Sequence, residues 1–147
     1  MNGSFTAHCR AALQTTRAEA SRLGHSFVGP EHILLGLLGL TDGIASTALD
    51  GLEIDRDELR TIAARDLPPP EPTPASGELP YAERSVTVLK NALREARDDG
   101  ASPVHSGHLL LATVGVEGWP EDLALDLPGL RRGVAEAARI SGEPLDF

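Results

Sequence analysis

The feature that most constrains this chain is an internal duplication. Residues 5–37 align without a gap with residues 81–113, an offset of 76 positions (81 − 5). The aligned pairs include Phe5 with Tyr81, Leu13 with Leu89, Glu19 with Glu95, Ala20 with Ala96, Gly24 with Gly100, Val28 with Val104, His32 with His108, Leu34 with Leu110 and Leu35 with Leu111. Repeated units of this size bury their apolar faces against each other. We therefore predict two related halves that share one core.

Each copy opens with the pattern of a long amphipathic helix. Apolar and small residues recur at steps of three and four from Phe5 to Leu23, and the same stripe runs from Tyr81 to Ala96. Thr6 is the predicted N-cap of the first helix. Gly24 and Gly100 stand where a left-handed C-cap is expected.

The rest of the chain predicts shorter helices. They begin at Pro30 and near Ser106, cover 43–52, 56–65 and 117–125, and end with 127–140, which Asp126 is expected to cap. Aromatic residues make up only 3% of the chain, so aliphatic side chains must build the core, which suits close-packed helices. We predict an all-α fold of about eight helices, with repeat one at about 5–65 and repeat two at about 81–141.

Between the copies, residues 66–80 hold six prolines, and five of them exclude both helix and sheet ladder: Pro68, Pro69, Pro70, Pro72 and Pro74. This segment is predicted to be an extended linker. A proline-rich ligand for another domain is the alternative interpretation.

The charge of the chain restricts its partners. The formal net charge is −9, and such a field repels nucleic acid phosphates and anionic lipids but favours cationic peptides or basic protein surfaces. Acidity that serves solubility alone is the alternative. No stretch is apolar enough to span a membrane, the start lacks signal-peptide features, and Cys9 is the only cysteine. We expect a cytoplasmic protein that binds neither nucleic acid nor membrane.

The segments FTAHCRAAL, LGHSFVGPEHILLGLL and PASGELPY resemble the Clp repeat domain, the N-terminal domain of ClpC- and ClpA-type AAA+ unfoldases. The resemblance covers nearly the whole chain, although the second copy matches mainly by position. It implies two four-helix repeats related by a pseudo-twofold axis. The P-loop motif G-x-x-x-x-G-K-[ST] does not occur, so we expect a stand-alone binding domain without an unfolding engine.

The resemblance also implies ligands: substrate proteins, adaptor proteins, phosphoarginine-tagged proteins and macrocyclic peptide antibiotics. In the family, a Thr at the start of the first helix and a Glu at the start of the second form a phosphoarginine pocket. Thr6 and Glu31 occupy these positions in the first copy, whereas Ala82 and Gly107 replace them in the second. We expect at most one such site. The alternative is that Thr6 is an ordinary N-cap and Glu31 a first-turn acid.

The family further carries a hydrophobic surface around the pseudo-twofold axis, where its two long helices and N-terminal residues meet. The matching candidates here are Asn2, Phe5, Arg10, Leu13, Tyr81, Val86 and Leu93. Asn2 replaces a usual aromatic residue, and Val86 replaces a frequent basic one. Leu13 and Leu93 are more simply explained by burial, while the Tyr81 hydroxyl needs water or a partner.

The histidines and the cysteine give weaker signals. His105 and His108 form H-x-x-H, and His25 and His32 lie in the matching part of the first copy, but no cysteine pair or carboxylate cluster completes a zinc set. Packing or helix capping is therefore the prediction for the histidines. Cys9 falls on the buried stripe of the first helix. We predict no metal, cofactor or catalytic residue.

Three functions follow. The leading prediction is a non-enzymatic module that shares ligands with a Clp unfoldase, as an adaptor that presents them or as a decoy that sequesters them. The second is an interaction module with decayed pockets that docks onto Clp unfoldase or protease components. The third, a hydrolase using His105, His108 or Cys9, is the least favoured.

Overall fold

The computed structural model describes residues 4–100, 103–123 and 125–146, and over these ranges the chain is all-helical. Seven helices are present: α1 (Ala7–Arg22), α2 (Pro30–Leu38), α3 (Ile44–Gly51), α4 (Arg56–Arg65), α5 (Glu83–Asp98), α6 (Ser106–Gly115) and α7 (Leu127–Ile140). None of the described helices is both long and apolar enough to cross a bilayer.

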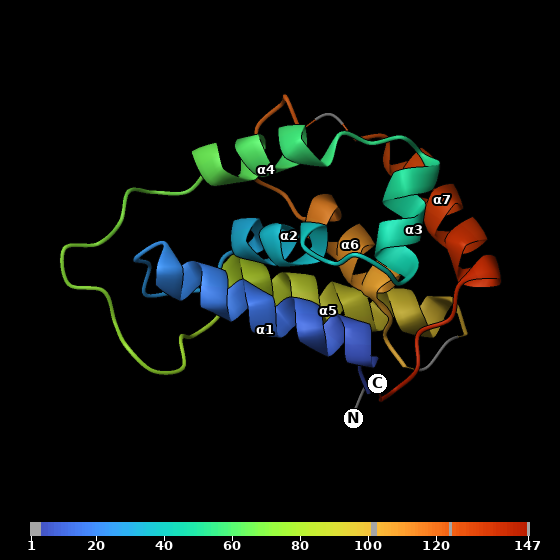
Figure 1. The fold of residues 1–147 in the computed structure, drawn as a ribbon, viewed down its shortest axis with the longest axis horizontal. Helices are drawn as coiled ribbons and strands as arrows, with labels where there is room; N and C mark the ends of the chain where they lie inside the picture. Colours follow the sequence, from blue (N-terminus) through green and yellow to red (C-terminus); the bar gives the residue numbers. More distant parts are fainter. Residues whose placement is uncertain (1–3, 101–102, 124, 147) are drawn as a thin grey trace.

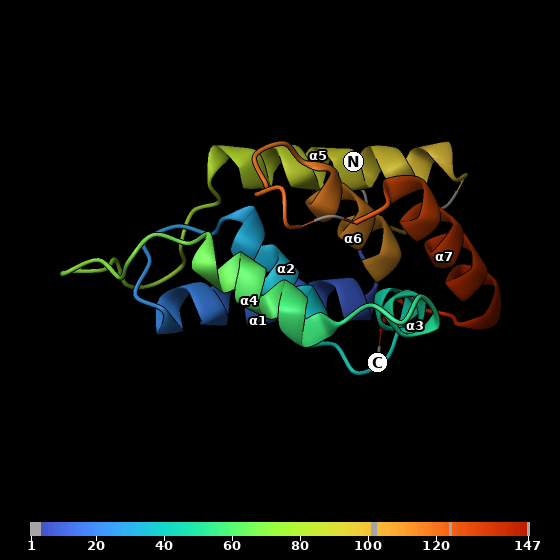
Figure 2. The ribbon, with the colours of Figure 1, turned by 90° about the horizontal axis from the view of Figure 1, so that it is seen from above.

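The helices are arranged around α2 and α6, which lie at the centre (Figure 1). α1 packs on α2 and α5 packs on α6, so that the two long helices flank the central pair (Figure 2). α4 covers the other side of α2, and α3 pairs with α7 at one end. Apart from Leu35 and Gly115, every residue of the central pair is buried. The core is aliphatic, as the composition predicts.

The predicted helix starts and stops are mostly confirmed. The Thr6 hydroxyl accepts a hydrogen bond from Cys9 N at 3.1 Å, and Asp55 caps α4 in the same way. Gly24 and Gly100 adopt left-handed φ angles of 79° and 65°. Asp126 occupies the N-cap position of α7, but its side chain makes no capping hydrogen bond.

The short helix predicted over 117–125 is wrong: the described residues of this segment form turns. Gly118 has a φ of 103°, which is outside the helical region, and Pro120 supplies no amide hydrogen. The Trp119 indole instead donates to the Thr113 carbonyl at 2.8 Å, which holds the turn against the end of α6. The structure therefore has seven helices in its described part, where we predicted about eight.

Two short parallel bridges join the copies to each other. Phe5 pairs with Val104, and Tyr81 pairs with Val28. In each bridge, the segment that precedes a long helix of one copy lies beside the segment that precedes the second helix of the other copy. The two bridges therefore lie at opposite ends of the long helices, in addition to the packing of α2 on α6 and of α3 on α7.

The proline-rich segment forms neither helix nor strand over 67–80, and it is attached at both ends. The Glu71 carboxylate accepts hydrogen bonds from Ser26 N and Oγ, both at 2.9 Å. Leu79 is buried in the core, and the Pro80 carbonyl accepts from Val28 N at 2.8 Å. Ala75 N also donates to Ser26 Oγ at 2.7 Å, so the segment is held near its middle as well as at its ends.

Gly36 permits the close approach of α2 to α1. A Cβ at this position would collide with Thr16 Oγ1 and would lie 2.5 Å from the Ala12 carbonyl oxygen. We expect Gly36→Ala to lower the free energy of unfolding by about 1–3 kcal/mol, because rigid backbone must move. Chemical denaturation measures this change.

Gly51 provides the matched control, because a Cβ there meets nothing within 4 Å. Gly51→Ala should change the free energy of unfolding by no more than about 1 kcal/mol, and in the stabilising direction. Equal stabilities of the two variants would contradict the packing described here.

Candidate functional site

The two residues predicted to form one pocket, Thr6 and Glu31, lie at opposite ends of α1. Thr6 caps its first turn, and 16 helical residues extend for about 24 Å. Glu31 lies in the first turn of α2, beside the C-terminal end of α1, where His25 and His32 are in contact. The two side chains therefore do not line a common pocket. The reason is that α1 and α2 form an antiparallel hairpin, so the start of α1 and the start of α2 lie at opposite ends of it. Thr6 and Glu31 therefore each lie beside residues of the second copy rather than beside one another.

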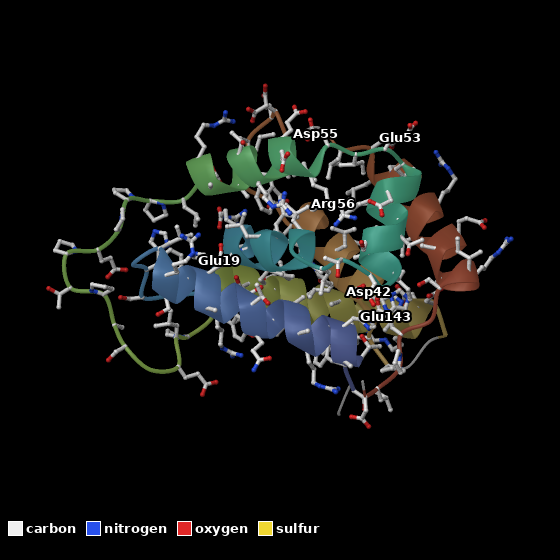
Figure 3. All side chains as sticks on the ribbon, in the orientation of Figure 1. Glu19, Asp42, Glu53, Asp55, Arg56 and Glu143 are labelled. Carbon is white, nitrogen blue, oxygen red and sulfur yellow. The ribbon has the colours of Figure 1, made fainter. Side chains whose placement is uncertain are left out.

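Thr6 belongs to a cluster that we call the Glu143 junction, formed by Thr6, Ile44, Ser106 and Glu143. Glu143 follows α7 and extends toward the start of α3 (Figure 3). Its carboxylate accepts hydrogen bonds from Thr6 Oγ1 at 2.7 Å, Ser106 N at 2.8 Å and Ile44 N at 2.6 Å, and also from the Ser106 hydroxyl. The starts of α1, α3 and α6 thus converge on one carboxylate.

The junction keeps Glu143 ionised. Burial alone would raise the pKa of this carboxyl, but the hydrogen bonds donated by Ser106, Thr6 and the backbone outweigh it, and the pKa is lowered. Helix N-termini add a favourable field for an anion. Because Gly43 has a φ of 96° and a Cβ there would lie 2.8 Å from the carboxylate, a side chain at this position would obstruct the junction.

Glu31 belongs to a second cluster, the Glu31 junction, formed by Glu31, Asp66, Arg84 and Trp119. Only 6% of Glu31 is exposed, and burial, followed by the neighbouring Asp66, raises its pKa. Arg84 opposes this rise: its guanidinium lies 3.4 Å from the carboxylate. The same guanidinium donates to the Glu117 carbonyl at 2.9 Å and lies 5.9 Å from the Trp119 ring centre. The Arg84 guanidinium therefore already lies against Glu31, the acid that was predicted to bind a ligand.

The predicted hydrophobic surface is divided between the two flanks of the central pair (Figure 2). Phe5, Leu13 and Leu93 are half-buried against the core, which agrees with a packing role. Arg10 is exposed and donates to the Phe5 carbonyl at 2.5 Å. Val86 is 40% exposed. Asn2 lies outside the described residues.

Tyr81 connects the two flanks. It is half-buried, and the Arg17 guanidinium of α1 lies 4.7 Å from its ring centre. Arg17 also forms an ion pair with Glu78 at 3.5 Å. Burial raises the pKa of Tyr81 above its ordinary value, so the phenol is neutral and can donate a hydrogen bond. Of the predicted surface residues, Tyr81 combines an aromatic face with a polar group most directly.

The histidines of the first copy form a directed chain of hydrogen bonds. Gly29 N donates to His32 Nδ1 at 2.9 Å, so the proton of this ring lies on Nε2. That nitrogen lies 3.0 Å from His25 Nδ1, and His25 Nε2 lies 2.8 Å from the Pro68 carbonyl. The chain is complete when both rings are neutral. It confirms the predicted capping role of His32 and ties the linker to α2.

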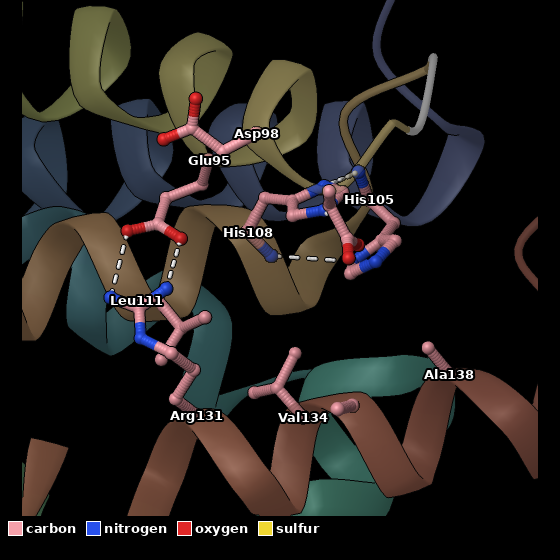
Figure 4. Close-up of a pocket in the computed structure, with 10 residues that line it drawn as sticks. Glu95, Asp98, His105, His108, Leu111, Arg131, Val134 and Ala138 are labelled. Carbon is pink, nitrogen blue, oxygen red and sulfur yellow. Dashed lines mark hydrogen bonds and ion pairs between the residues drawn. The ribbon is translucent and has the colours of Figure 1, made fainter. Parts of the chain in front are cut away.

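In the second copy, His105 and His108 stack with ring centres 3.5 Å apart and cap α6 reciprocally (Figure 4). They line a pocket of about 250 Å³ between α5, α6 and α7, which also contains the Glu95–Arg131 ion pair. His108 Nε2 lies 3.1 Å from Asp99. The sequence analysis did not identify a carboxylate near these histidines. In the structure, Asp99 and the two rings bring three metal-ligand atoms together.

The hydrogen bonds of this set argue against a metal ion. Each Nδ1 accepts from a backbone N–H, at 3.1 Å for His108 and 3.2 Å for His105, so each Nε2 carries the proton. A metal bound to Nε2 would move the proton to Nδ1, where it would face that backbone N–H. The donor set thus fits helix capping better than coordination.

Cys9 is fully buried, and burial strongly raises the pKa of its thiol. The reactive thiolate is therefore disfavoured, and the expected packing role fits the structure.

The residues that sequence reasoning missed are Glu143, Arg84 and Asp99. Glu143 and Arg84 act through contacts that are distant in sequence, whereas Asp99 lies nine residues before His108, on the other side of a turn.

The neutral histidines generate a pH prediction. Burial, followed by the neighbouring histidine, lowers the pKa of His32 and of His105 to about 4, against about 6.5 in an unfolded chain. The unfolded state therefore binds more protons between pH 6.5 and 4, and stability must fall as the pH is lowered through this window. We expect each histidine to contribute at most about 3 kcal/mol to this loss, since one pKa unit corresponds to about 1.4 kcal/mol.

His32→Gln isolates the effect, because glutamine retains a capping acceptor at this position but does not titrate. Denaturation curves from pH 7.5 to 4 should fall less steeply for this variant than for the unmodified chain. Parallel curves would refute a neutral His32 in the folded state.

Comparisons with known proteins agree with this architecture. The family model of the Clp repeat (R) N-terminal domain matches residues 4–118. The ClpA homologue of Porphyra purpurea is 35% identical over 95% of this chain, and chloroplastic ClpC2 of Arabidopsis thaliana is 38% identical over 73%. This chain spans only 17% and 11% of their lengths.

Among solved structures, the N-domain of ClpV from Vibrio cholerae superposes with a TM-score of 0.78 at 16% identity, covering 95% of this chain and 88% of that one. A complex of the ClpV N-domain with a VipB peptide superposes with a TM-score of 0.75 at 17% identity, covering 95% and 90%. With the sequence matches, this likeness leads to one conclusion: the chain belongs to the Clp repeat N-terminal domain family.

Proposed function

We propose that this chain is a non-enzymatic binding module that captures a peptide or tagged protein, as an adaptor or a decoy in Clp proteolysis. The observation that carries the proposal is its membership in the family, together with the fold shared with the ClpV N-domain that was solved with a VipB peptide. The buried thiol of Cys9 and the capping histidines support a role without catalysis.

The proposal includes a pseudo-twofold relation between two repeats. The reciprocal bridges support it, because Phe5 and Tyr81 are aligned positions, as are Val104 and Val28. The equivalent capping of α2 by His32 and α6 by His108 supports it as well. A ligand site in one copy would then have a counterpart in the other, built from different side chains.

The Glu31 junction is the best candidate for a guanidinium ligand such as phosphoarginine. Its buried carboxylate already faces one guanidinium, that of Arg84. Carboxylate and guanidinium form a matched, charge-assisted pair. An external guanidinium must therefore displace Arg84 before it can reach Glu31, and Arg84 becomes the residue that limits affinity.

Calorimetry with phosphoarginine tests this site. We expect Arg84→Ala to tighten binding by roughly tenfold, because about 1.4 kcal/mol of internal competition is removed. Adding Glu31→Gln to that variant should abolish binding, because the carboxylate partner is lost.

Arg94→Ala is the matched control, since Arg94 is exposed on the same helix and the charge change is identical. An equal gain in the control would show a general charge effect. Absence of phosphoarginine binding in every variant would remove this ligand class.

The second candidate function is an interaction module with decayed pockets that docks onto Clp unfoldase or protease components. The observation that favours it is that both junctions are filled internally: Arg84 faces Glu31, and Glu143 faces Thr6. In this case the surface around Tyr81 and Arg17 is the docking surface, with a macrocyclic peptide antibiotic as a competing ligand.

A pull-down from native lysate with the immobilised chain distinguishes the two functions. Recovery of Clp subunits without affinity for phosphoarginine or a macrocyclic peptide favours docking. We expect Tyr81→Ala to reduce recovery at least about fivefold, because an aromatic anchor of an interface contributes on the order of 1–2 kcal/mol or more. Tyr81→Phe keeps the ring and should retain most of the recovery. Unchanged recovery with Tyr81→Ala would exclude this surface.

A further inference from the structure

A groove with a volume of about 590 Å³ lies between α3 and α7, the two helices that pair at one end of the molecule (Figure 1). Leu52, the C-cap residue of α3, lies against α7, because a Cβ added at Gly133 would be 2.7 Å from its side chain. The other residues that give the groove its space are small: Ala48, Gly51, Gly129 and Ala137. This face therefore leaves room for side chains of another molecule.

Exposed apolar side chains gather at this groove. Ile140 is 70% exposed and Leu52 is 40% exposed, and both line it. In the part of the chain that the structure describes, only Val86 and Leu145 are comparable large apolar residues, and neither lines the groove. Apolar side chains that cluster at a groove are typical of a surface that another protein covers, whereas single exposed ones are ordinary.

The groove also carries a cation without an ion pair. Nine of the 13 Lys and Arg side chains form ion pairs with described acids, and Arg132 is one of the four that do not. Arg132 is exposed and lines the groove. An exposed cation in a chain with a net charge of −9 is thus left to pair with an acid from outside.

The acid that matches Arg132 lies one turn further along the same helix. Glu136 also lines the groove, and residues four positions apart are neighbours on one face of a helix. Glu136 pairs with Arg139 at 3.6 Å, but both side chains are more than half exposed, so this pair contributes little stability. The carboxylate therefore remains available to another cation.

This arrangement of charges is complementary to itself. In a twofold contact each residue meets a counterpart that it meets again in reverse. If two α7 helices pack antiparallel, Arg132 of each chain lies beside Glu136 of the partner subunit. Ile140 then lies over the end of the groove at Gly129 of the partner subunit, where the missing side chain leaves room. Parallel packing would instead place like charges against each other, which is unfavourable.

We propose that the groove between α3 and α7 is the contact surface of a homodimer, and that its occupant is α7 of a second copy of this chain, packed antiparallel. This inference goes beyond the proposed function and does not depend on it, because the groove is separate from Glu31 and from the surface around Tyr81. A dimer presents each ligand site of the chain twice, which increases the avidity for a partner that carries two ligands.

The contact is expected to be weak. The interface is about one helix wide, and the net charge of −9 on each copy opposes association. Small interfaces of this kind belong to transient complexes, so we expect a dissociation constant between about 10 μM and about 1 mM. Sedimentation equilibrium over this range of concentrations measures it.

A charge exchange tests the pairing. Arg132→Glu should weaken dimerisation at least about tenfold, because acids then face acids across the twofold axis. Glu136→Arg should have a similar effect through facing cations. The double variant, Arg132→Glu with Glu136→Arg, exchanges the two signs and restores the pairs, so its dissociation constant should return to within about threefold of that of the unmodified chain.

Arg94→Glu is the matched control, because Arg94 is an exposed cation of α5 that also lacks an ion pair, and the change in net charge is the same as in Arg132→Glu. This control should dimerise like the unmodified chain. Ile140→Ser tests the apolar part of the contact. Because Ile140 is 70% exposed, the variant should fold normally and still weaken dimerisation at least about fivefold.

A chain that stays monomeric at about 1 mM overturns the proposal. A dimer that responds no more to Arg132→Glu and Ile140→Ser than to Arg94→Glu overturns it as well, because the contact must then lie elsewhere. If the double variant remains as weak as the single ones, the antiparallel pairing is wrong. Circular dichroism of each variant checks that the fold is unchanged.

Discussion

The structure depends on the burial of the α2–α6 pair. These two short helices are apolar on nearly every face, and the five other described helices cover them. Burial of a whole helix also buries its N-terminus, where backbone N–H groups lack helical partners. Each of these termini must therefore be satisfied by side chains, and this requirement places histidines, hydroxyls and charges in an otherwise aliphatic interior.

The two ends of the central pair meet this requirement differently. At the start of α2, a neutral histidine caps the backbone, and the acid of the first turn faces Arg84. At the start of α6, two stacked histidines cap the backbone, and Glu143 collects the remaining donors together with those of α1 and α3. One end thus presents an acid to a cation, and the other presents donors to an anion. The starts of α2 and α6 therefore differ in charge, although the alignment of the two copies makes them equivalent.

These internal pairs bear on how a family member of this kind binds ligands. Both junctions are chemically complementary to a ligand, yet both already hold a group of the chain itself. The phosphoarginine that we propose for the Glu31 junction would therefore compete with the Arg84 guanidinium of the chain itself. At the surface around Tyr81, the Arg17 guanidinium lies over the ring and pairs with Glu78.

The sequence by itself determined the helical class, the boundaries of most helices, the aliphatic core and the family. These depend on periodicity and capping, which act over a few residues: Thr6, Gly24 and Gly100 behave as their local patterns predict. The helix predicted over 117–125 was wrong because the apolar residues of this segment suggested a helix, while Gly118 and Pro120 gave the backbone a turn conformation.

Only the tertiary structure decided the candidate sites. Thr6 and Glu31 are neighbours in a family pattern, but an antiparallel hairpin separates them by the length of α1. Thr6 instead meets Glu143, 137 positions away, and Glu31 meets Arg84, 53 positions away. Such pairs carry no local signal, because they exist only after the helices have packed and burial has forced each polar group to find a partner.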